Sequence, residues 1–474
     1  MSVVDVRMLI GGAWRSGGDP FEVRDPYRGE LVSRAPTASA AEVDEAVAAA
    51  AAAAPRVAAM ATAERQAVLA RAASLVRERR DDLARTIARE TGKSLKDSLA
   101  EIDRSVGTLQ VSGEEAKRVE GRHVPLGGAA LGEGKVAVML RFPVGVVAAI
   151  TPFNAPFNLM CHKVGPAFAA GNATVLKPPP QCPLVAMRLA EIMVEAGLPA
   201  GALNVVYGGA AVGERLVDDP RVDFITFTGS TRAGAAIRAR AGLRRVALEL
   251  GGTGPTIVHA DADVRTAAVT CARNAFRLAG QSCISVQRVY VHESVVARFT
   301  DELLAFVPTL VVGDPLDPAT DIGTLIDEAA AARVESWVRE AVAGGARVLC
   351  GGTRRGAQLA PTVVADVTPD MRLVCEEVFG PVMSILPYRS LDDAIRQVND
   401  SPFGLQCGVF SASLEVAFRV IREVRAGGII VNGSSTWRVD HMPYGGVKQS
   451  GIGREGPRYA IEEMTEERLV VFNL

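Results

Sequence analysis

The spacing of hydrophobic residues predicts strands and then helices in the first quarter of the chain. Residues 7–35 hold short apolar runs between glycine pairs, a pattern typical of strands and turns. Residues 39–42 read Ser-Ala-Ala-Glu, a capping box that opens an alanine-rich helix. Apolar residues then recur every three or four positions over 62–80, and further helices are predicted over 81–91 and 94–118.

A different pattern begins at residue 119. Residues 119–143 form two extended segments around glycines, which predicts a hairpin that projects from the body. Apolar strands, glycine turns and helical segments then alternate up to residue 246 and again over 247–430, and a last strand is predicted at 468–474. Such alternation predicts an α/β fold with two parallel-sheet units. In the first unit the predicted strands are 144–150, 173–176, 202–206 and 224–227, and the predicted helices are 161–169, 185–196, 213–218 and 231–241.

Composition and charge narrow the class of protein. The chain has 474 residues, which is too long for one compact core and indicates two or three domains. Its net charge is −2 and its aromatic content is 5%, so no nucleic-acid partner is expected. The first residues do not resemble a signal peptide and no stretch approaches the roughly 18 apolar residues of a membrane span, so no membrane association is expected.

The cysteines and histidines suggest neither disulfides nor a metal site. The seven cysteines are scattered and form no C-x-x-C pair. The five histidines form no ligand cluster. This usage favours a reducing cytoplasm, and no bound metal is expected.

Three stretches contain residues suited to ligand binding. Asn154 follows an apolar strand and could donate a side-chain N–H to a developing oxyanion, although Asn beside proline is also common in simple turns. Lys177 stands at the end of a predicted strand, where α/β sheets bind ligands; a solvated strand-end lysine is the alternative. Residues 227–234, Phe-Thr-Gly-Ser-Thr-Arg-Ala-Gly, could offer backbone N–H groups to a phosphate, or could be only a tight turn.

Two further stretches could supply reacting groups. Glu249 lies between apolar residues, where desolvation would raise the pKa of its carboxyl and suit it to act as a general base. The alternative is a glutamate that faces water at a strand edge. Cys283 follows Gly-Gln-Ser; a lone cysteine is commonly buried and inert, and a nucleophile needs a stabilised thiolate with access to substrate.

Seven motifs follow one another along the chain. They are Pro152-Phe-Asn154, Leu176-Lys-Pro178, Phe227-Thr-Gly-Ser-Thr231, Glu249-Leu-Gly-Gly252, Gly280-Gln-Ser-Cys283, Glu377-Val-Phe-Gly-Pro381 and Pro443-Tyr-Gly-Gly-Val-Lys-Gln-Ser-Gly451. Taken together and in this order, they resemble the aldehyde dehydrogenase superfamily over essentially the whole chain. The C-terminal stretches 438–446 and 461–465 are similar to the branch of lactaldehyde, non-phosphorylating glyceraldehyde-3-phosphate and phosphonoacetaldehyde dehydrogenases.

The resemblance implies two Rossmann-like domains and an arm. It also implies a homodimer or a homotetramer. The cofactor-binding domain would comprise residues 1–118 and 144–246, the catalytic domain 247–430, and the β-hairpin oligomerisation arm 119–143 and 454–474, with 431–453 linking back to the active site.

The resemblance also implies the chemistry. Cys283 would attack the aldehyde carbon, and Asn154 with the backbone N–H of Cys283 would hold the oxyanion of the thiohemiacetal. After hydride transfer to a nicotinamide, Glu249 would activate the water that hydrolyses the thioester. Relatives that pass the acyl group to coenzyme A usually lack a glutamate here, so a free carboxylate product is expected.

A set of residues would surround the cofactor. Lys177 would hold the adenosine ribose, Ser230 the pyrophosphate and Glu377 the nicotinamide ribose. Pro180 stands where many NAD-preferring relatives carry glutamate, and no carboxylate there would repel a 2′-phosphate, so we expect good use of NADP, with NAD also possible. The full set is Thr151, Pro152, Phe153, Lys177, Pro180, Gly213, Phe227, Thr228, Gly229, Ser230, Leu250, Gly251, Glu377 and Phe379.

A small polar aldehyde is the expected substrate, with an anionic aldehyde as the alternative. The candidate substrate contacts are Arg104, Phe157, Ser282 and Arg438. The two arginines could clamp a phosphate, phosphonate or carboxylate, or could simply be surface or salt-bridged residues. Ser282 stands where phosphate-using relatives often have arginine, which favours a neutral polar or hydroxylated aldehyde.

Three other functions fit the same residues less well. Glu249 argues against a coenzyme A-acylating enzyme. The cofactor-type glycine turns, and the lack of a histidine motif that would indicate a Cys–His pair, argue against a cysteine hydrolase without a redox step. The complete set Asn154, Glu249 and Cys283 argues against a catalytically silent structural protein.

Overall fold

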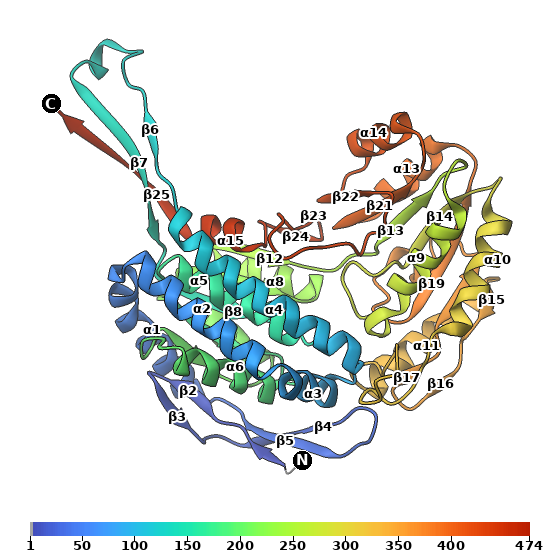
Figure 1. Cartoon of the computed structure of the whole chain (residues 1–474), viewed down its shortest axis with the longest axis horizontal. Helices are drawn as coiled ribbons and strands as arrows, with labels where there is room; N and C mark the ends of the chain where they lie inside the picture. The colour runs from blue at the N-terminus through green and yellow to red at the C-terminus, as the bar shows by residue number, and fades with distance from the viewer. Residues whose placement is uncertain (1–2) are drawn as a thin grey trace.

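The computed structural model describes residues 3–474. Figure 1 shows two α/β bodies beside each other and a long arm that ends at the C-terminus. Each body is built around one large, mostly parallel sheet, of eight strands in the first and seven in the second. This arrangement confirms the predicted α/β class with two sheet units and a projecting hairpin.

The first sheet has the strand order β24-β12-β11-β8-β9-β10-β2-β3. Its five central strands pair in parallel, whereas β24, β2 and β3 pair antiparallel at the edges. All five residues of β8, Val-Val-Ala-Ala-Ile, are buried, as expected for a parallel strand covered on both faces. The strands are β2 (Met8–Ile10), β3 (Ala13–Arg15), β8 (Val146–Ile150), β9 (Ala173–Lys177), β10 (Leu203–Val205), β11 (Phe224–Thr228), β12 (Arg245–Glu249) and β24 (Gly451–Ile452).

Helices surround the first sheet, and a small sheet of order β1-β5-β4 precedes them in the chain (Figure 1). That small sheet comprises β1 (Val4–Asp5), β4 (Pro20–Arg24) and β5 (Leu31–Pro36). The helices are α1 (Ala40–Ala59), α2 (Thr62–Glu78), α3 (Arg80–Thr91), α4 (Leu95–Glu115), η1 (Ala116–Arg118), α5 (Pro156–Ala169), α6 (Pro183–Glu195), α7 (Ala210–Asp218), α8 (Thr231–Ala241) and α15 (Pro457–Glu463).

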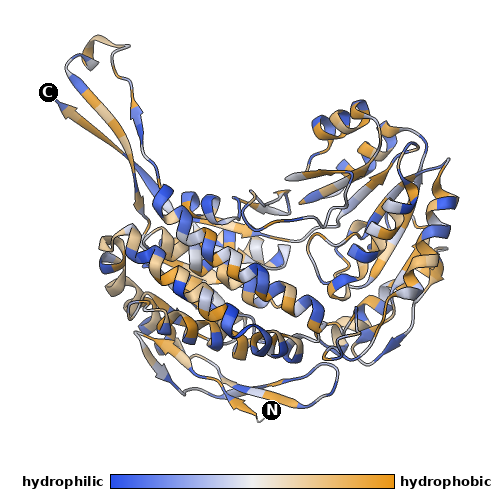
Figure 2. Cartoon of the chain, viewed as in Figure 1, coloured by the Kyte–Doolittle hydropathy of each residue, from blue (hydrophilic) through white to orange (hydrophobic). Residues whose placement is uncertain are grey.

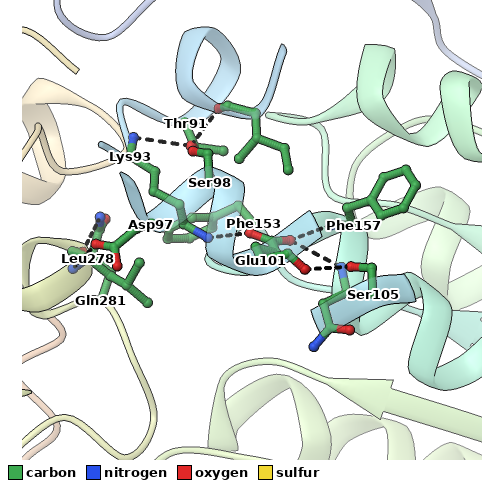
Figure 3. Close-up of polar contacts among 12 residues, drawn as sticks. Thr91, Lys93, Asp97, Ser98, Glu101, Ser105, Phe153, Phe157, Leu278 and Gln281 are labelled. Carbon is green, nitrogen blue, oxygen red and sulfur yellow. Dashed lines mark hydrogen bonds and ion pairs between the residues drawn. The ribbon is translucent and has the colours of Figure 1, made fainter. Parts of the chain in front are cut away.

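Helices α5 and α6 begin without a capping side chain of their own, because remote glutamates take that place. Each has proline near its first position. Glu101 on α4 accepts the backbone N–H groups of Phe157 and Asn158 at 2.8 and 3.1 Å, and it pairs with the buried Lys93 (Figure 3). Glu90 on α3 accepts two N–H groups at the start of α6 at 2.8 and 3.0 Å. These carboxylates satisfy the free N–H groups that every helix start presents.

The second sheet has the order β15-β18-β19-β14-β13-β21-β22, and only β15 pairs antiparallel. Its strands are β13 (Pro255–Val258), β14 (Arg288–His292), β15 (Arg347–Cys350), β18 (Thr362–Ala365), β19 (Val382–Tyr388), β21 (Gln406–Phe410) and β22 (Gly428–Val431). Its helices are α9 (Val264–Phe276), η3 (Arg277–Gly280), α10 (Val296–Phe306), η4 (Val307–Thr309), α11 (Glu328–Ala343), α12 (Arg372–Cys375), α13 (Leu391–Asn399) and α14 (Leu414–Glu423). Two short pairs complete it: β16 (Arg354–Arg355) with β17 (Gln358–Leu359), and β20 (Phe403–Gly404) with β23 (Val447–Lys448).

The arm is a three-stranded antiparallel sheet of order β25-β7-β6. It consists of β6 (Arg122–Val124), η2 (Ala130–Gly132), β7 (Lys135–Pro143) and β25 (Thr465–Asn473). The last strand pairs with β7 along its whole length, from Thr465 opposite Pro143 to Asn473 opposite Lys135. Figure 2 shows hydrophobic residues along the strands of the projecting arm. Five apolar side chains of β7 and β25 are exposed: Val136, Leu140, Leu469, Val471 and Phe472.

Three predicted boundaries need correction. The predicted boundary between 246 and 247 falls inside β12, whose backbone pairs with β11 in the first sheet, so the second sheet begins only at Pro255. The helix predicted over 161–169 begins at Pro156 because Glu101 caps it from another helix, a signal that lies outside the local sequence. Within 454–474, only the residues of β25 belong to the arm sheet; α15 packs on α4 and α5.

Three observations bear on the protein classes considered above. In the described chain, no single helix has both the length and the apolar character to cross a bilayer, although α1 and α2 together, bent by 114°, meet the length and composition test. Residues 3–474 hold no group of His, Cys, Asp and Glu side chains that could bind a metal ion. The seven cysteines are unpaired.

Candidate active site

Four parallel strands of the first sheet end side by side and bring the predicted site residues to one edge. Ile150 at the end of β8 lies opposite Lys177 and Phe227, and Thr228 lies opposite Glu249. The chain runs from β8 outward to β10 and then crosses back to β11 on the other side of β8. This reversal is a topological switch point, where α/β sheets bind ligands beyond the carboxyl ends of the strands.

A cavity of about 440 Å³ opens at this edge and is lined by both bodies. Phe153 and Phe379 meet across it with ring centroids 5.9 Å apart and planes at 90°. Fifteen of the predicted site residues line it: Arg104, Pro152, Phe153, Asn154, Thr228, Gly229, Ser230, Glu249, Leu250, Gly251, Ser282, Cys283, Glu377, Phe379 and Arg438. The structure therefore brings together residues that are up to 334 positions apart, Arg104 and Arg438.

Cys283 lies on a loop with unusual backbone geometry. Leu278 and Ala279 have φ of 56° and 50°, in the left-handed region that ordinary side chains rarely adopt. Asp97 in the first turn of α4 holds this segment. Its carboxylate accepts the Arg277 Nε–H at 2.7 Å, and it accepts the Leu278 N–H at 3.3 Å (Figure 3). A helix of the first body thus fixes the loop that carries the candidate nucleophile of the second.

The Cys283 sulfur lies 3.0 Å from the Tyr444 hydroxyl. Burial raises the pKa of the Cys283 thiol to about 12, the Tyr444 hydrogen bond lowers it, and the negative charge of Glu377 raises it. Its backbone N–H meets no acceptor within residues 3–474. The residue is half-buried at the cavity and can reach a substrate in it.

Asn154 lies in the segment between β8 and α5, at the switch point. Its side-chain Oδ1 is buried and finds no hydrogen-bond partner within the described chain. Because α5 starts at Pro156 and is anchored by Glu101, the preceding segment is fixed at the cavity wall. An amide held there can donate an N–H toward an oxygen atom in the cavity.

Glu249 ends β12 and is 5% exposed, so it does not face water at a strand edge. Neither of its carboxylate oxygens has a hydrogen-bond partner among residues 3–474. Burial, and next the nearby charge of Glu455, raise the pKa of the Glu249 carboxyl well above its usual value, while Arg438 and Lys163 lower it. Such an environment produces a carboxyl group that binds its proton more strongly than an exposed glutamate does.

Glu455, which lines the same cavity, is paired. Its Oε1 accepts from Arg438 Nη2 at 2.6 Å, and its Oε2 lies 3.7 Å from Lys163 Nζ. Although burial opposes the charged form, His162, Arg438 and Lys163 hold the pKa of Glu455 down to about 2. Arg438 also lies over the Tyr444 ring, with its guanidinium carbon 3.8 Å from the ring centroid.

Arg104 is paired with Asp440, which makes it a salt-bridged residue at the cavity. Its Nε and Nη2 donate to the two carboxylate oxygens at 3.0 and 2.7 Å. The same carboxylate contacts His162 Nε2 at 2.9 Å and accepts from Asn158 Nδ2 at 3.1 Å. The hydrogen bonds from His162 and Arg104 keep the pKa of Asp440 low in spite of its burial. Both candidate substrate arginines therefore already have a carboxylate partner.

Several residues at the strand ends fit a dinucleotide cofactor. Lys177 is buried, yet its Nζ donates only to the neighbouring Pro178 carbonyl at 3.4 Å, and burial lowers its pKa to about 8. The hydroxyls of Thr151 and Thr228 have no partner within the described chain. A buried cation and hydroxyls without partners are groups that a ribose or phosphate would satisfy.

Two more elements complete this donor set. Ser230 begins α8, whose first N–H groups suit a phosphate. Glu377 accepts the Gly252 N–H at 3.0 Å, and burial raises its pKa to about 7. Its second oxygen lies against Gly251, where an added Cβ would be only 2.5 Å away. The glycine thus allows the close approach of the two bodies.

Six predicted residues do not line the cavity itself. Gly213 lies beside Lys177, where an added Cβ would be 3.5 Å from the lysine Cδ, and Phe227 lies under Gly229. Phe157 is fully buried in the core of the first body and does not line the cavity, so its contact with the substrate stays a prediction. The full group is Thr151, Phe157, Lys177, Pro180, Gly213 and Phe227.

The cavity also contains residues that sequence reasoning did not single out. Tyr444 and Glu455 belong to this group, together with Arg277 and Arg333. Tyr444 lies inside the Pro-Tyr-Gly-Gly motif, so the motif itself was a signal. Glu455 had no signal in the local sequence, because its partners come from α5 and from the segment before β23.

Comparisons with known proteins agree with this geometry. Residues 14–470 match the model of the aldehyde dehydrogenase family. The chain is 48% identical over 468 residues, 98% of each chain, to a 3-sulfolactaldehyde dehydrogenase of Priestia megaterium. The structure resembles that of aldehyde dehydrogenase 21 from Physcomitrella patens in complex with succinate, with a TM-score of 0.97, 37% identity and coverage of 100% and 99%.

A second solved structure points to the branch expected from the C-terminal motifs. An NADP-dependent glyceraldehyde-3-phosphate dehydrogenase from Bacillus halodurans, complexed with NADP, aligns with a TM-score of 0.97, 35% identity and 99% coverage of both chains. The family model and these relatives extend over nearly all of the chain, and they confirm the resemblance inferred from the seven motifs. The chain belongs to the aldehyde dehydrogenase family.

Proposed function

We propose that this protein oxidises a small polar aldehyde to its carboxylate with NAD(P), through Cys283 and Glu249. The observation that carries the proposal is that Cys283, Glu249 and Asn154 line one cavity at the switch point of the first sheet. A nucleophile, a buried carboxyl without a partner and an amide donor are the groups that acyl chemistry requires.

The first half of the reaction forms a bond between Cys283 and the substrate. The thiolate sulfur attacks the aldehyde carbon, and the carbonyl π electrons move to oxygen. Asn154 and the unpaired backbone N–H of Cys283 donate hydrogen bonds to that oxyanion. When bound, NAD(P) supplies the acceptor for a hydride. Loss of the hydride restores the C=O bond and leaves a thioester on Cys283.

The second half is hydrolysis. The deprotonated Glu249 carboxylate takes a proton from water, and the hydroxide adds to the thioester carbon. The thiolate of Cys283 then leaves, and the product is the free carboxylate. Because the pKa of Glu249 is raised, its carboxylate binds the proton more strongly than an exposed glutamate would, which suits a base.

The cofactor preference leans toward NADP. Lys177 provides a buried cation without a strong acceptor, and Pro180 places no carboxylate beside it. The Bacillus halodurans relative is NADP-dependent, which supports the same choice, although other relatives in the family bind NAD. Pro180→Glu should shift the ratio of kcat/KM values toward NAD by about tenfold, since it adds a negative charge beside the 2′-phosphate position. An unchanged ratio would contradict this.

The natural aldehyde could carry an anionic group, and this is the second candidate function. The 48% identical relative is named for 3-sulfolactaldehyde, whose sulfonate is anionic, and Arg104, Arg277 and Arg333 line the cavity. Arg104 is already paired with Asp440, and Arg438 with Glu455, which favours a neutral polar substrate. The name of this relative thus favours an anionic substrate, whereas the pairing of both arginines favours a neutral one.

We also propose that the arm assembles identical chains into a dimer or tetramer in a reducing cytoplasm. The exposed apolar side chains of β7 and β25 on a projecting sheet are typical of an interface. The seven unpaired cysteines support a reducing compartment. Size-exclusion chromatography with light scattering would show a monomer if the arm has no such role.

A turnover panel tests the whole proposal. Reduced nicotinamide would be followed with NAD and NADP against lactaldehyde, 3-sulfolactaldehyde, glyceraldehyde 3-phosphate and benzaldehyde, with Cys283→Ala as the blank. Turnover without coenzyme A, lost in Cys283→Ala, is the expected result. Turnover that required coenzyme A, or that survived in Cys283→Ala, would contradict the proposed mechanism.

A further inference from the structure

Tyr444 is the one hydroxyl that contacts the Cys283 sulfur in the described chain. The distance from oxygen to sulfur is 3.0 Å, within hydrogen-bonding range for sulfur. Tyr444 is 3% exposed and packs with Ile284 and Leu405 in a small apolar cluster that includes Cys283. This packing therefore holds the Tyr444 hydroxyl against the Cys283 sulfur.

The backbone of Tyr444 is fixed as firmly as its ring. Its N–H donates to the Glu455 carbonyl at 2.9 Å, and its carbonyl accepts the Glu455 N–H at 2.6 Å. The carboxylate of the same Glu455 holds Arg438 at 2.6 Å. One residue thus positions both the tyrosine and the guanidinium above it.

Arg438 lies on the Tyr444 ring, with 3.8 Å between the guanidinium carbon and the ring centroid. A cation over a phenol ring draws electron density from it and makes the O–H a stronger donor. Burial nevertheless keeps the pKa of Tyr444 well above its usual value, so the hydroxyl retains its proton at neutral pH. The phenol can therefore act as a donor toward a thiolate.

We propose that Tyr444 is a catalytic residue that donates its O–H to the Cys283 thiolate, with Arg438 as the positioning residue that strengthens this donor. The inference rests on the proposed function in that Cys283 is the nucleophile. The hydrogen bond stabilises the thiolate before attack and again when it leaves the thioester. It weakens in between, because the sulfur loses its negative charge when the carbon–sulfur bond forms.

The test is the rate at which iodoacetamide alkylates Cys283 as a function of pH. Peptide mass spectrometry would follow Cys283 separately from the six other cysteines. Tyr444→Phe keeps the ring and removes the donor, so less thiolate forms at a given pH. We expect alkylation about three- to tenfold slower at pH 8, the range that remains after the greater nucleophilicity of a more basic thiolate is considered.

Tyr388→Phe is the matched control. Tyr388 is also a buried tyrosine whose hydroxyl is hydrogen-bonded, at 2.9 Å to His259, but it lies in the second sheet away from Cys283. It should leave the Cys283 alkylation rate unchanged. Equal rates in Tyr444→Phe and the wild type would overturn the proposal, and so would a decrease shared by Tyr388→Phe.

Arg438→Lys tests the second part. It retains a positive charge for Glu455 but loses the flat group that lies on the ring. We expect a smaller slowing of alkylation than in Tyr444→Phe, and no slowing would remove Arg438 from the proposal. Slower alkylation in Tyr444→Phe combined with no aldehyde turnover in the wild type would refute the proposed function and retain the tyrosine–sulfur interaction.

Discussion

Glu249 and Glu455 line the same cavity, yet the pKa values of their carboxyls move in opposite directions. Glu249 ends β12 and both its oxygens lack a hydrogen-bond partner within residues 3–474. Glu455 lies just before α15 and contacts Arg438 and Lys163. Burial opposes the charge of both, so the difference comes from their partners.

This comparison shows how one cavity provides two kinds of carboxyl group. A buried carboxylate with cationic partners is a structural group, since removing its charge leaves those cations unpaired. A buried carboxyl without partners binds its proton more strongly and can exchange it during a reaction. The charge of Glu455 itself contributes to the raised pKa of Glu249. The charge of the paired Glu455 therefore helps to raise the pKa of Glu249, the candidate base.

The largest effect is expected from Glu249→Gln. The amide keeps the size of the side chain but cannot take a proton from water, so thioester hydrolysis should slow by about 10³-fold. Acylation should persist, and rapid mixing should show a burst of about one equivalent of reduced nicotinamide per active site before turnover stops. Glu249→Asp is the matched variant that keeps the carboxyl. Full steady-state turnover in Glu249→Gln would assign the base to another residue.

Glu455→Gln should mainly lower the stability of the fold, in contrast to Glu249→Gln, which should mainly slow hydrolysis. The substitution leaves Arg438 and Lys163 without a buried counter-charge, and the free energy of unfolding at pH 7 should fall by about 3 kcal/mol. Urea denaturation would measure it. The pKa of Glu455 is lowered to about 2 from an ordinary value of 4.5, so its contribution is present above pH 4.5 and is lost as the pH falls toward 2. A variant as stable as the wild type at pH 7 would contradict the pairing.

The same variant should change the pH profile of hydrolysis. Glu249 must be deprotonated to act, so kcat should rise with pH through its raised pKa. Removing the charge of Glu455 removes a repulsion and leaves the Arg438 and Lys163 charges to favour the carboxylate. The acidic limb of the kcat profile should therefore move to lower pH. A limb that stays in place would show that the two carboxyls are not coupled.

The smallest effect on catalysis is expected from a change in the more exposed ion pair, Arg104 with Asp440. The Arg104 side chain is 38% exposed, so the pair is more screened than Arg438 with Glu455. Under the second candidate function, an anionic substrate, Arg104→Ala should raise KM for an anionic aldehyde by about fivefold and leave KM for a neutral aldehyde nearly unchanged. Glyceraldehyde and its 3-phosphate are a suitable substrate pair. Equal increases for both would show that Arg104 supports the structure and not the substrate.

Much of the fold could be predicted because its signals are local. The capping box at Ser39 and Glu42 forms as expected, and the strand-to-helix turn at Ser230 caps α8. The start of α5 was missed because its cap, Glu101, comes from α4. The boundary before β12 was misplaced because membership of a sheet depends on which strand pairs with which, and the sequence pattern does not state this.

The candidate site divides in the same way. Asn154, Lys177 and Thr228 could be placed at one sheet edge, because carboxyl ends of parallel strands meet there, whereas the place of Glu249 beside them followed only from the pairing of β12 with β11. The burial of Phe157 in the core could not be predicted, since it depends on how α5 packs against the rest of the first body. Neither the pairing of Arg104 with Asp440 nor the contact between Tyr444 and Cys283 had a sequence signal.

The sequence by itself determined the succession of strands and helices along the chain, the family and the residue types at the strand ends. Periodicity, caps and motifs act over a few residues, so they can be recognised in the chain alone. The tertiary structure decided which carboxyl lacks a partner and which arginine is paired. It also decided which hydroxyl meets the sulfur. These properties depend on burial and on distances of a few ångströms between residues as far apart as Cys283 and Tyr444, and only the folded chain sets those distances.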